Sequence, residues 1–201
     1  GQSVAVAGNI GPTLLDTLAS HIDAGTPPEV WVLELSSLQL DGVTGFEPTA
    51  ATVLNVTQDH LDYPGGMAAY WEAKARLFAW PGLRAAVVNI DDPQGAALLR
   101  TLPATLEAWS LSCSDAPARL RAADIHHHAG GLAFTVAEGE ARHLLATRLI
   151  GQYNVSNLLG VIAGLRTLGV PLADAVAVCA RLHPVPGRMQ CVAAAGQPLV
   201  A

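Results

Sequence analysis

The residues of this sequence best suited to chemistry lie in Asn55-Val-Thr-Gln-Asp-His-Leu-Asp62 and in the run Ala73-Lys-Ala-Arg76 that follows it. The first stretch offers two carboxylates and the imidazole of His60, and the second offers the amine of Lys74. An imidazole, two carboxylates and a half-buried lysine gathered at one edge of a sheet are the parts of a metal–phosphate site. The alternative is a polar strand-to-helix loop with a solvated lysine.

Two elements must position these groups. Residues 49–56 form a short, mostly apolar run that predicts a buried strand, and the run stops at polar residues. There a parallel strand would reach the carboxyl edge of its sheet, where open α/β sheets bind ligands. Residues 67–78 carry helical spacing, which places Lys74 on the same side as Tyr70 and Phe78, one turn before the helix end.

Composition narrows the class of protein. The chain has 201 residues, of which 51% are hydrophobic and 14% are charged, so most of it is expected to form packed core in one domain, with or without an appendage. A net charge of -6 argues against nucleic acid as a partner, but not against a nucleotide held by backbone amides and a metal. No apolar run approaches the ~20 residues that span a bilayer, so no membrane partner is expected.

The cysteines and the chain ends add two expectations. Cys113, Cys179 and Cys191 are an odd, widely spaced set without a CxxC pair, which is typical of reduced thiols in a cytoplasmic protein. The chain starts almost directly in a predicted strand and ends in an apolar run. We therefore expect it to be part of something longer.

The order of elements predicts an α/β fold, with a mainly parallel sheet flanked by helices. The predicted strands that we expect to share this sheet run through Ser3, Val32, Val53 and Val87. Between roughly 104 and 149 short runs separated by glycine pairs predict a small antiparallel β subdomain at the end of that sheet. Predicted helices follow at 155–168 and 172–182, and a last strand at 189–194.

Seven motifs in order along the chain resemble the central ATP-binding domain of the bacterial Mur ligases: G-N-I-G, L-E-L-S-S, N-V-T-x-D-H-L-D, A-K-x-R-x-F, V-N-x-D-D-P, G-x-x-N-V-S-N and P-G-R-M. These are cytoplasmic, ATP-dependent enzymes that add amino acids to UDP-N-acetylmuramic acid during peptidoglycan synthesis. Each motif alone is weak, whereas the ordered combination is highly specific. The family fold is P-loop-NTPase-like.

The resemblance is a mosaic. Residues 1–60 are similar to the D-glutamate-adding ligases, and residues 60–201 to the ligases that add the third residue, a diamino acid or lysine. The family's phosphate-binding loop, of the G-x-x-G-K-[ST] type, is absent from these 201 residues. The resemblance therefore makes residues 1–201 an incomplete central domain, without the family's N-terminal UDP-binding and C-terminal amino-acid-binding domains.

The resemblance implies a metal site. In the family the acid at the position of Glu34 and the imidazole at the position of His60 help to hold Mg²⁺, and the lysine at the position of Lys74 is carbamylated by CO₂, which turns a cation into a carboxylate-like ligand. Carbamylation requires a neutral amine. The structural alternatives are a strand-end acid paired with a cation, a loop histidine bonded to a neighbouring aspartate, and a lysine reaching solvent.

The resemblance also implies a substrate and nucleotide site. Asn9 matches an asparagine that faces the metal and the acyl phosphate, although an asparagine between two glycines also suits a turn. Asn154 and Asn157 match positions that contact adenine, and Asn154 could equally be a helix N-cap. Arg188 matches an arginine near the ribose and phosphates of ATP.

Two further sets of polar residues could have either a functional or a structural role. Ser36 and Ser37 could touch the muramoyl substrate or cap the loop that holds them. In the triple histidine, His126 and His128 would share a strand face, yet adjacent histidines on a surface strand are more often without a ligand.

The function implied by the resemblance is acyl activation: ATP phosphorylates the carboxylate of a UDP-N-acetylmuramoyl-peptide, and the amine of an amino acid displaces the phosphate. Glu34, His60, Lys74, Asn9 and Arg188 would serve that chemistry. Two alternatives remain: a nucleotide- or substrate-binding module without turnover, and a recombined or truncated chain without activity. The amino acid that is added cannot be read from this chain.

Overall fold

A computed structural model describes residues 2–56, 66–128 and 130–185 of the chain. They divide into two compact units, which are described separately. The first unit contains the described residues up to Phe46 and residues 66–77, and the second contains residues 47–56 and the described residues from 78 onward. The predicted strand at 189–194 lies outside the described residues.

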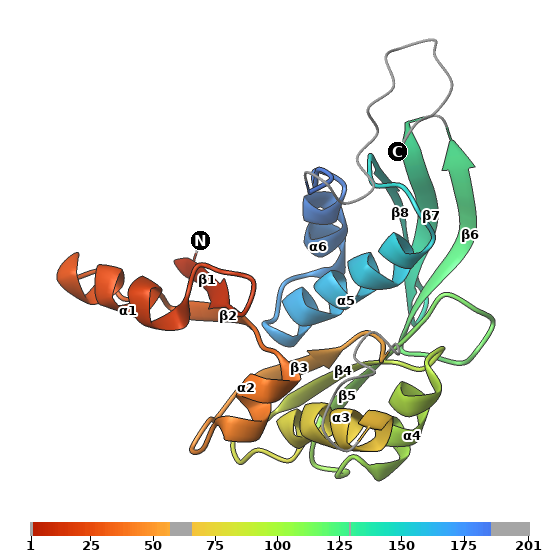
Figure 1. The fold of residues 1–201 in the computed structure, drawn as a ribbon. Coiled ribbons are helices and arrows are strands. Elements are labelled where there is room, and N and C mark those ends of the chain that lie inside the picture. Colours follow the sequence, from red (N-terminus) through yellow and green to blue (C-terminus); the bar gives the residue numbers. More distant parts are fainter. Residues whose placement is uncertain (1, 57–65, 129, 186–201) are drawn as a thin grey trace. The chain divides into compact units, whose positions relative to one another are not determined.

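The first unit is built on a pair of parallel strands, β1 (Val4–Gly8) and β2 (Val30–Glu34), joined by helix α1 (Leu14–Asp23). The hydroxyl of Thr13 caps α1 by accepting the N–H of Asp16. Figure 1 shows this β–α–β arrangement in red and orange. The unit also contains α2 (Ser37–Gly42), α3 (Gly66–Ala75) and most of the short 3₁₀ helix η1 (Arg76–Phe78).

The second unit contains one six-stranded sheet in the order β3-β4-β5-β6-β7-β8. Strands β3 to β6 are parallel, and β6 to β8 are antiparallel. The strands are β3 (Ala50–Val53), β4 (Ala85–Asn89), β5 (Glu107–Ser112), β6 (Leu120–His128), β7 (Gly131–Glu138) and β8 (Ala141–Thr147), and the helices are α4 (Pro93–Thr101), α5 (Tyr153–Thr167) and α6 (Leu172–Cys179).

Helices on both faces explain why β4 is buried along its whole length. Ala85 and Val87 belong to the core cluster that includes the inner residues of α5, and alternate residues of a strand point to opposite faces. On the other face α4 lies so close that a Cβ on Gly95 would sit 3.2 Å from a methyl group of Val88. An apolar run such as Ala85–Val88 is the expected sequence for a strand in this position.

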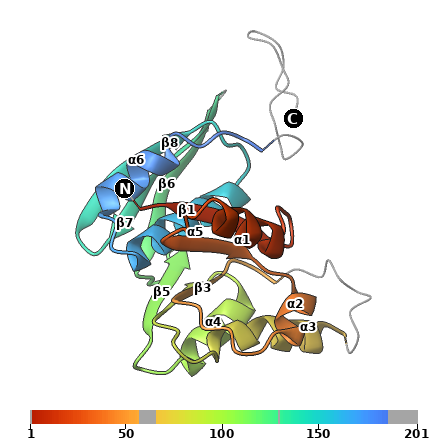
Figure 2. The same cartoon turned by 90° about the vertical axis from the view of Figure 1, so that its left-hand side faces the viewer.

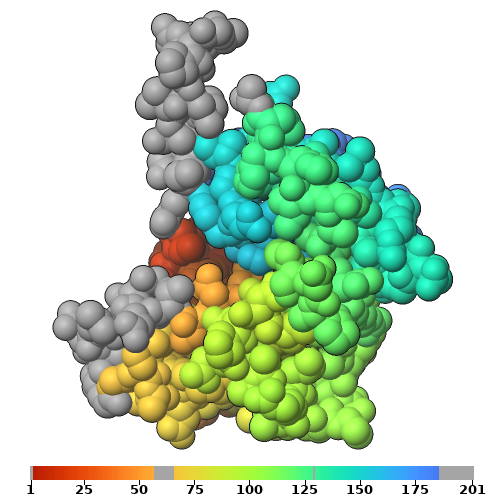
Figure 3. All heavy atoms as spheres, turned by 90° about the vertical axis from the view of Figure 1, so that its right-hand side faces the viewer, coloured from red at the N-terminus to blue at the C-terminus, as the bar shows by residue number. Residues whose placement is uncertain are grey.

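The antiparallel strands are covered on one face only. Leu132, Phe134, Val136 and Leu145 point into the core beneath α5 and α6, which lie on the same side of the sheet (Figures 1 and 2). Figure 3 shows the other face of β6–β8, in green and cyan, open to solvent. A bidentate ion pair holds α5 against β7: Nε and Nη2 of Arg166 donate to the two carboxylate oxygens of Glu138 at 2.9 and 3.1 Å.

The predicted fold class, a mainly parallel sheet flanked by helices, is confirmed, but two details are wrong. The strands through Ser3 and Val32 form their own pair and do not join those through Val53 and Val87. Residues 107–111 are not antiparallel: β5 is parallel to β4, because α4 is a crossover helix between them. The antiparallel strands β6 to β8 do lie at the end of the parallel sheet, as predicted.

Among the described helices, none has the length and apolar content that crossing a bilayer requires.

Candidate functional site

A tight turn follows β1 and is hydrogen-bonded to Glu34, the last residue of β2. Gly8 pairs with Glu34 in the parallel register, and the backbone N–H of Asn9 donates to the Glu34 carbonyl at 2.8 Å. The side chain of Glu34 binds the same turn, since its Oε2 accepts the N–H of Ile10 at 3.1 Å. Backbone and carboxylate of one residue therefore fix the turn that presents Asn9.

Gly8 is required for this close approach. Its φ is +143°, and a Cβ built on it would lie 2.0 Å from the carbonyl oxygen of Glu34. No side chain fits at that distance, so the G-N-I-G sequence is explained by geometry at its first residue. The structure brings Asn9 and Glu34 together at the carboxyl ends of neighbouring parallel strands, as the sequence predicts.

The chemistry of Glu34 and Asn9 suits a hard cation or a phosphate. Glu34 is exposed, and one of its two carboxylate oxygens carries the bond to Ile10, which leaves the other as a candidate ligand. Asn9 is exposed, with an amide that can donate and accept. Magnesium prefers such oxygen ligands together with water and substrate phosphates. These residues therefore fit Mg²⁺ as a part of its ligand set.

Ser36 is a helix cap. Its hydroxyl accepts the N–H of Gln39 at 3.3 Å, and Gln39 Oε1 accepts the N–H of Ser36 at 2.9 Å, which together form a capping box at the start of α2. Ser37 is buried in the first turn of this helix, with 7% of its surface exposed. The capping interpretation is confirmed for Ser36, and Ser37 offers little surface to a substrate.

Lys74 lies in the last turn of α3 and is half-buried. Its Nζ sits 4.8 Å from the centroid of the Tyr70 ring, one helical turn earlier. Tyr70 is itself buried, so the predicted common side of Lys74 and Tyr70 is confirmed, whereas Phe78 lies beyond the end of α3 and its place on that side stays a prediction. The partial burial of Lys74 agrees with the carbamylation hypothesis, whereas its contact with the ring suits the charged amine.

In the second unit, Asn154 and Asn157 are bonded to each other at the start of α5. Asn157 Nδ2 donates to Asn154 Oδ1 at 3.3 Å, and Asn154 Nδ2 donates to the carbonyl of Ile150 at 2.7 Å. The N-cap of the helix is Gln152, so the interpretation of Asn154 as the cap is wrong. Its amide instead ties the preceding loop to the helix and orients Asn157, whose amide oxygen can still accept and whose nitrogen has a second N–H.

In the second unit, Asp92 forms a link between elements that was not anticipated from the sequence. Asp92 caps α4 by accepting the N–H groups of Gln94 and Gly95, and its other oxygen accepts the N–H of Val56 at 3.0 Å. It therefore fixes the chain directly after β3, four residues before His60. The Asp-Pro sequence predicts the cap, whereas the bond to Val56 depends on tertiary structure.

Two predicted site residues, His60 and Arg188, lie outside the described residues. Within the described ranges no group of three or more His, Cys, Asp or Glu side chains is placed to hold a metal ion. His126 and His128 do lie on β6, exposed to solvent. The structure therefore places Asn9 beside Glu34 and Asn154 beside Asn157, and it places Lys74 over Tyr70.

The two described cysteines are poor nucleophiles. Burial raises the pKa of Cys113 to about 11, with a smaller contribution from the charge of Asp91, and burial raises the pKa of Cys179 to about 11. Both thiols are therefore protonated at neutral pH, and a protonated thiol neither attacks nor binds a metal well. This agrees with reduced structural cysteines.

We expect iodoacetamide to modify Cys113 and Cys179 slowly at pH 8 and faster as the pH approaches 11. The raised pKa values also make the free energy of unfolding depend on pH. The unfolded thiols ionise near pH 9, their ordinary value, so the stabilisation from keeping both thiols protonated in the fold is present below pH 9 and is lost between pH 9 and 11. Mass spectrometry of peptides after timed labelling measures both rates, with N-acetylcysteine as the reference. Labelling at pH 8 as fast as the reference would contradict the raised pKa values.

Comparison with known proteins gives a consistent family. The model of the Mur ligase middle domain matches residues 11–165. The chain is 61% identical over 172 residues to the UDP-N-acetylmuramoyl-L-alanyl-D-glutamate–2,6-diaminopimelate ligase of Acidovorax sp. (strain JS42), covering 84% of this chain and 34% of that protein. It is 67% identical over 99 residues to the UDP-N-acetylmuramoylalanine–D-glutamate ligase of Albidiferax ferrireducens, covering 49% and 19%.

Solved structures agree. A UDP-N-acetylmuramoyl-L-alanyl-D-glutamate–2,6-diaminopimelate ligase superimposes with a TM-score of 0.84 at 28% identity, over 96% of this chain and 43% of that one. The MurF ligase of Thermotoga maritima in complex with ADP shares the fold, with a TM-score of 0.71 at 20% identity over 97% and 45% of the chains. The chain thus spans about a third of the length of the diaminopimelate ligase that it matches.

The predicted resemblance to two ligase classes is confirmed, since both are among the relatives. Because 84% and 49% together exceed the whole chain, the two matched stretches must overlap.

Proposed function

This chain belongs to the Mur ligase middle-domain family, and from that premise we propose that it supplies the nucleotide and metal site of an ATP-dependent amide-forming ligase of peptidoglycan synthesis. The substrates proposed are a UDP-N-acetylmuramoyl-peptide and an amino acid, as the names of the relatives state for those proteins. The observation that carries the proposal is the turn in which Glu34 holds the backbone of Asn9 and Ile10 at the end of two parallel strands.

The proposed reaction has two steps. A carboxylate oxygen of the muramoyl-peptide attacks the γ-phosphorus of ATP, and the bond to the β-phosphate oxygen breaks to release ADP. The amine of the amino acid then attacks the acyl carbon, and phosphate leaves with the electrons of the carbon–oxygen bond while the nitrogen loses a proton. Bound Mg²⁺ would offset charge on the transferring phosphoryl group.

The chain's own residues would position these partners. Glu34, together with His60 and a carbamylated Lys74, would hold the cation, and Asn9 would lie beside the acyl phosphate. Asn157, oriented by its bond to Asn154, offers an amide that can pair with adenine by one donor and one acceptor. Arg188 would contact the ribose and phosphates. The ADP bound by the Thermotoga maritima ligase supports a nucleotide in this fold.

The second candidate is a nucleotide-binding module without turnover. The sequence observation that favours it is the absence of G-x-x-G-K-[ST] from the 201 residues. A phosphate-binding loop supplies backbone N–H groups, a lysine and a hydroxyl for the metal. A recombined chain without activity is a further possibility, favoured by the match to two ligase classes.

We expect the isolated 201-residue chain to bind ATP with a dissociation constant no tighter than about 1 mM, which corresponds to about 4 kcal/mol, and to form no amide. The reason is that Asn154, Asn157 and Arg188 would hold the adenosine end, whereas these 201 residues contain no phosphate-binding loop to hold the triphosphate. Titration calorimetry with Mg-ATP, and phosphate release with UDP-muramoyl-peptide and amino acids, measure both. Micromolar, magnesium-dependent ATP binding would show that the phosphate site lies within these residues.

Asn157→Ala tests the nucleotide site in a ligase that carries these residues as its middle part. We expect the KM for ATP to rise about tenfold with little change in kcat, because loss of one hydrogen-bonding amide costs roughly 1.5 kcal/mol of binding in ground and transition states alike. Ser156→Ala is the control, since that hydroxyl donates to the Tyr153 carbonyl of the same helix at 3.0 Å. Equal KM values for ATP in both variants would contradict a role of Asn157 in binding adenine.

A further inference from the structure

Two arginines of the second unit lie in one row across the antiparallel strands. Arg121 of β6 pairs with Ala137 of β7, and Ala137 pairs with Arg142 of β8. Residues directly opposite one another on neighbouring strands project to the same face. That face is the solvent side, because the adjacent residues Ala122 and Val136 belong to the core cluster. Two cationic side chains therefore flank one small residue.

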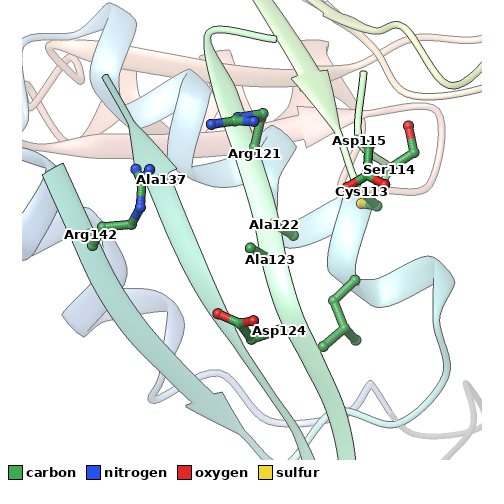
Figure 4. Close-up of a pocket in the computed structure, with 10 residues that line it drawn as sticks. Cys113, Ser114, Asp115, Arg121, Ala122, Ala123, Asp124, Ala137 and Arg142 are labelled. Atoms are coloured by element: carbon green, nitrogen blue, oxygen red, sulfur yellow. The ribbon is translucent and has the colours of Figure 1, made fainter. Parts of the chain in front are cut away.

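The two guanidinium groups converge. Figure 4 shows both directed over Ala137, toward one another. Arg142 is held by its own hairpin, since Nη1 donates to the carbonyls of Gly139 at 3.0 Å and Ala141 at 3.3 Å. In the described part of the chain, neither arginine forms an ion pair. Each guanidinium has five N–H donors, so several remain available to a ligand.

This space is part of a pocket of about 450 Å³ on the open face of the sheet. Ala137 is only 4% exposed although it lies on the outer face, so it forms the floor between the arginines. Acidic side chains line other parts: Asp115 beside Cys113, and Asp124, whose carboxylate accepts the Thr135 hydroxyl at 3.3 Å. Figure 4 shows the carboxylate of Asp124 at the end of the pocket away from the guanidinium groups.

We propose that the Arg121–Ala137–Arg142 row binds a small oxyanion, either a phosphate group or a carboxylate. Like charges that converge without a counterion repel, and an oxyanion between them removes that repulsion while accepting charge-assisted hydrogen bonds from both forks. The small side chain at position 137 leaves the volume that the anion occupies. Asp124 at the far end disfavours extended polyanions and favours a compact ligand.

This site is separate from the proposed adenine contacts. Asn154 and Asn157 lie on α5, which packs on the core face of the sheet, whereas the arginine row lies on the other face. The proposal of an anion site is therefore independent of the proposed ligase activity.

The test is an NMR titration of the 201-residue chain with inorganic phosphate and, in a second arm, with acetate, at constant ionic strength to cancel screening. We expect saturating shifts of the Ala137 amide and of the Arg121 Nε–H. The arm with the lower dissociation constant identifies the class of anion. Arg121→Gln and Arg142→Gln should each raise that dissociation constant at least tenfold.

The matched control is Arg100→Gln, which removes the same charge from the exposed end of α4. It should leave the dissociation constant within twofold. Unchanged amide shifts of Phe134 and Leu145 show that the core is intact in each variant, and Arg121→Lys, which keeps the charge, should weaken binding less than Arg121→Gln. The proposal is overturned if neither anion gives saturable shifts, if Arg100→Gln weakens binding as much as the other two, or if Arg121→Gln binds as the native chain does.

Discussion

Replacing Lys74 by alanine is expected to lower the rate of amide formation about a hundredfold or more in a ligase that carries this chain as its middle part, because loss of a preorganised electrostatic group commonly costs that much. If the amine carries a carbamate, the change removes a metal ligand. Its effect on folding should be small, since the contact with Tyr70 at 4.8 Å contributes about 0.5–1 kcal/mol. Phosphate release and urea denaturation measure the two effects separately.

Arg76→Ala is the control for Lys74→Ala. It removes a cation two residues away, whose exposed ion pair with Asp41 contributes at most about 1 kcal/mol, and should leave the rate within severalfold. Formate or acetate should partly restore the Lys74→Ala variant by supplying a carboxylate at the vacated position. Activity near the native level, or a loss of stability as large as the loss of rate, would contradict the role of Lys74. By the family resemblance, His60→Ala should be as damaging as Lys74→Ala.

The second large effect is expected from Gly8→Ala, which should destabilise the first unit by about 3 kcal/mol. The added methyl group would lie 2.0 Å from the Glu34 carbonyl oxygen, so β1 and β2 must separate, and φ +143° is unfavourable for alanine. The N–H of Asn9 then loses its bond to Glu34. Urea denaturation gives the free energy, and hydrogen exchange of the Asn9 and Ile10 amides shows whether the turn has opened.

Gly25→Ala separates the two causes of that effect. Gly25 also has a positive φ, +64°, but nothing lies within 4 Å of a Cβ placed there. It should therefore cost only the backbone preference, about 1 kcal/mol. Equal losses in the two variants would mean that the close approach of Gly8 to Glu34 contributes nothing.

Local sequence patterns predicted most elements well. Signals typical of helix starts lie where caps are observed: Thr13 follows Pro12 before α1, and Asp92 precedes Pro93 in the first turn of α4. The short α2 was not anticipated, although Ser36 and Gln39 form a capping box that the sequence spacing could have indicated. Capping is a local interaction, and for that reason it is readable from sequence.

Strand partners were harder to predict. An apolar run at Val30–Glu34 looks the same whether its neighbour is β1 alone or a larger sheet, so the separate β1–β2 pair could not be foreseen. The direction of β5 could have been, because a helix between two strands implies a parallel crossover. Pairing is a tertiary property, and periodicity reports only which faces are buried.

In the candidate site, too, local features could be predicted from the sequence and tertiary ones could not. Asn9 and Glu34 meet because the two strands that carry them end at one edge, which a general rule for α/β sheets predicts. The bond between Asn154 and Asn157 follows from helical spacing. The arginine row was not foreseen, since Arg121 and Arg142 become neighbours only through the register of β6, β7 and β8.

That register depends on one irregularity in β6. Between Ala123 and His126 the strand carries one more residue than β7 opposite it, and Asp124 there has φ 52°. The extra residue lets Ile125 pack against the core while the carboxylate of Asp124 faces the pocket. Losing a single residue here would reverse the inward and outward sides of everything beyond it. The strand should therefore accept many substitutions in evolution but almost no change in length.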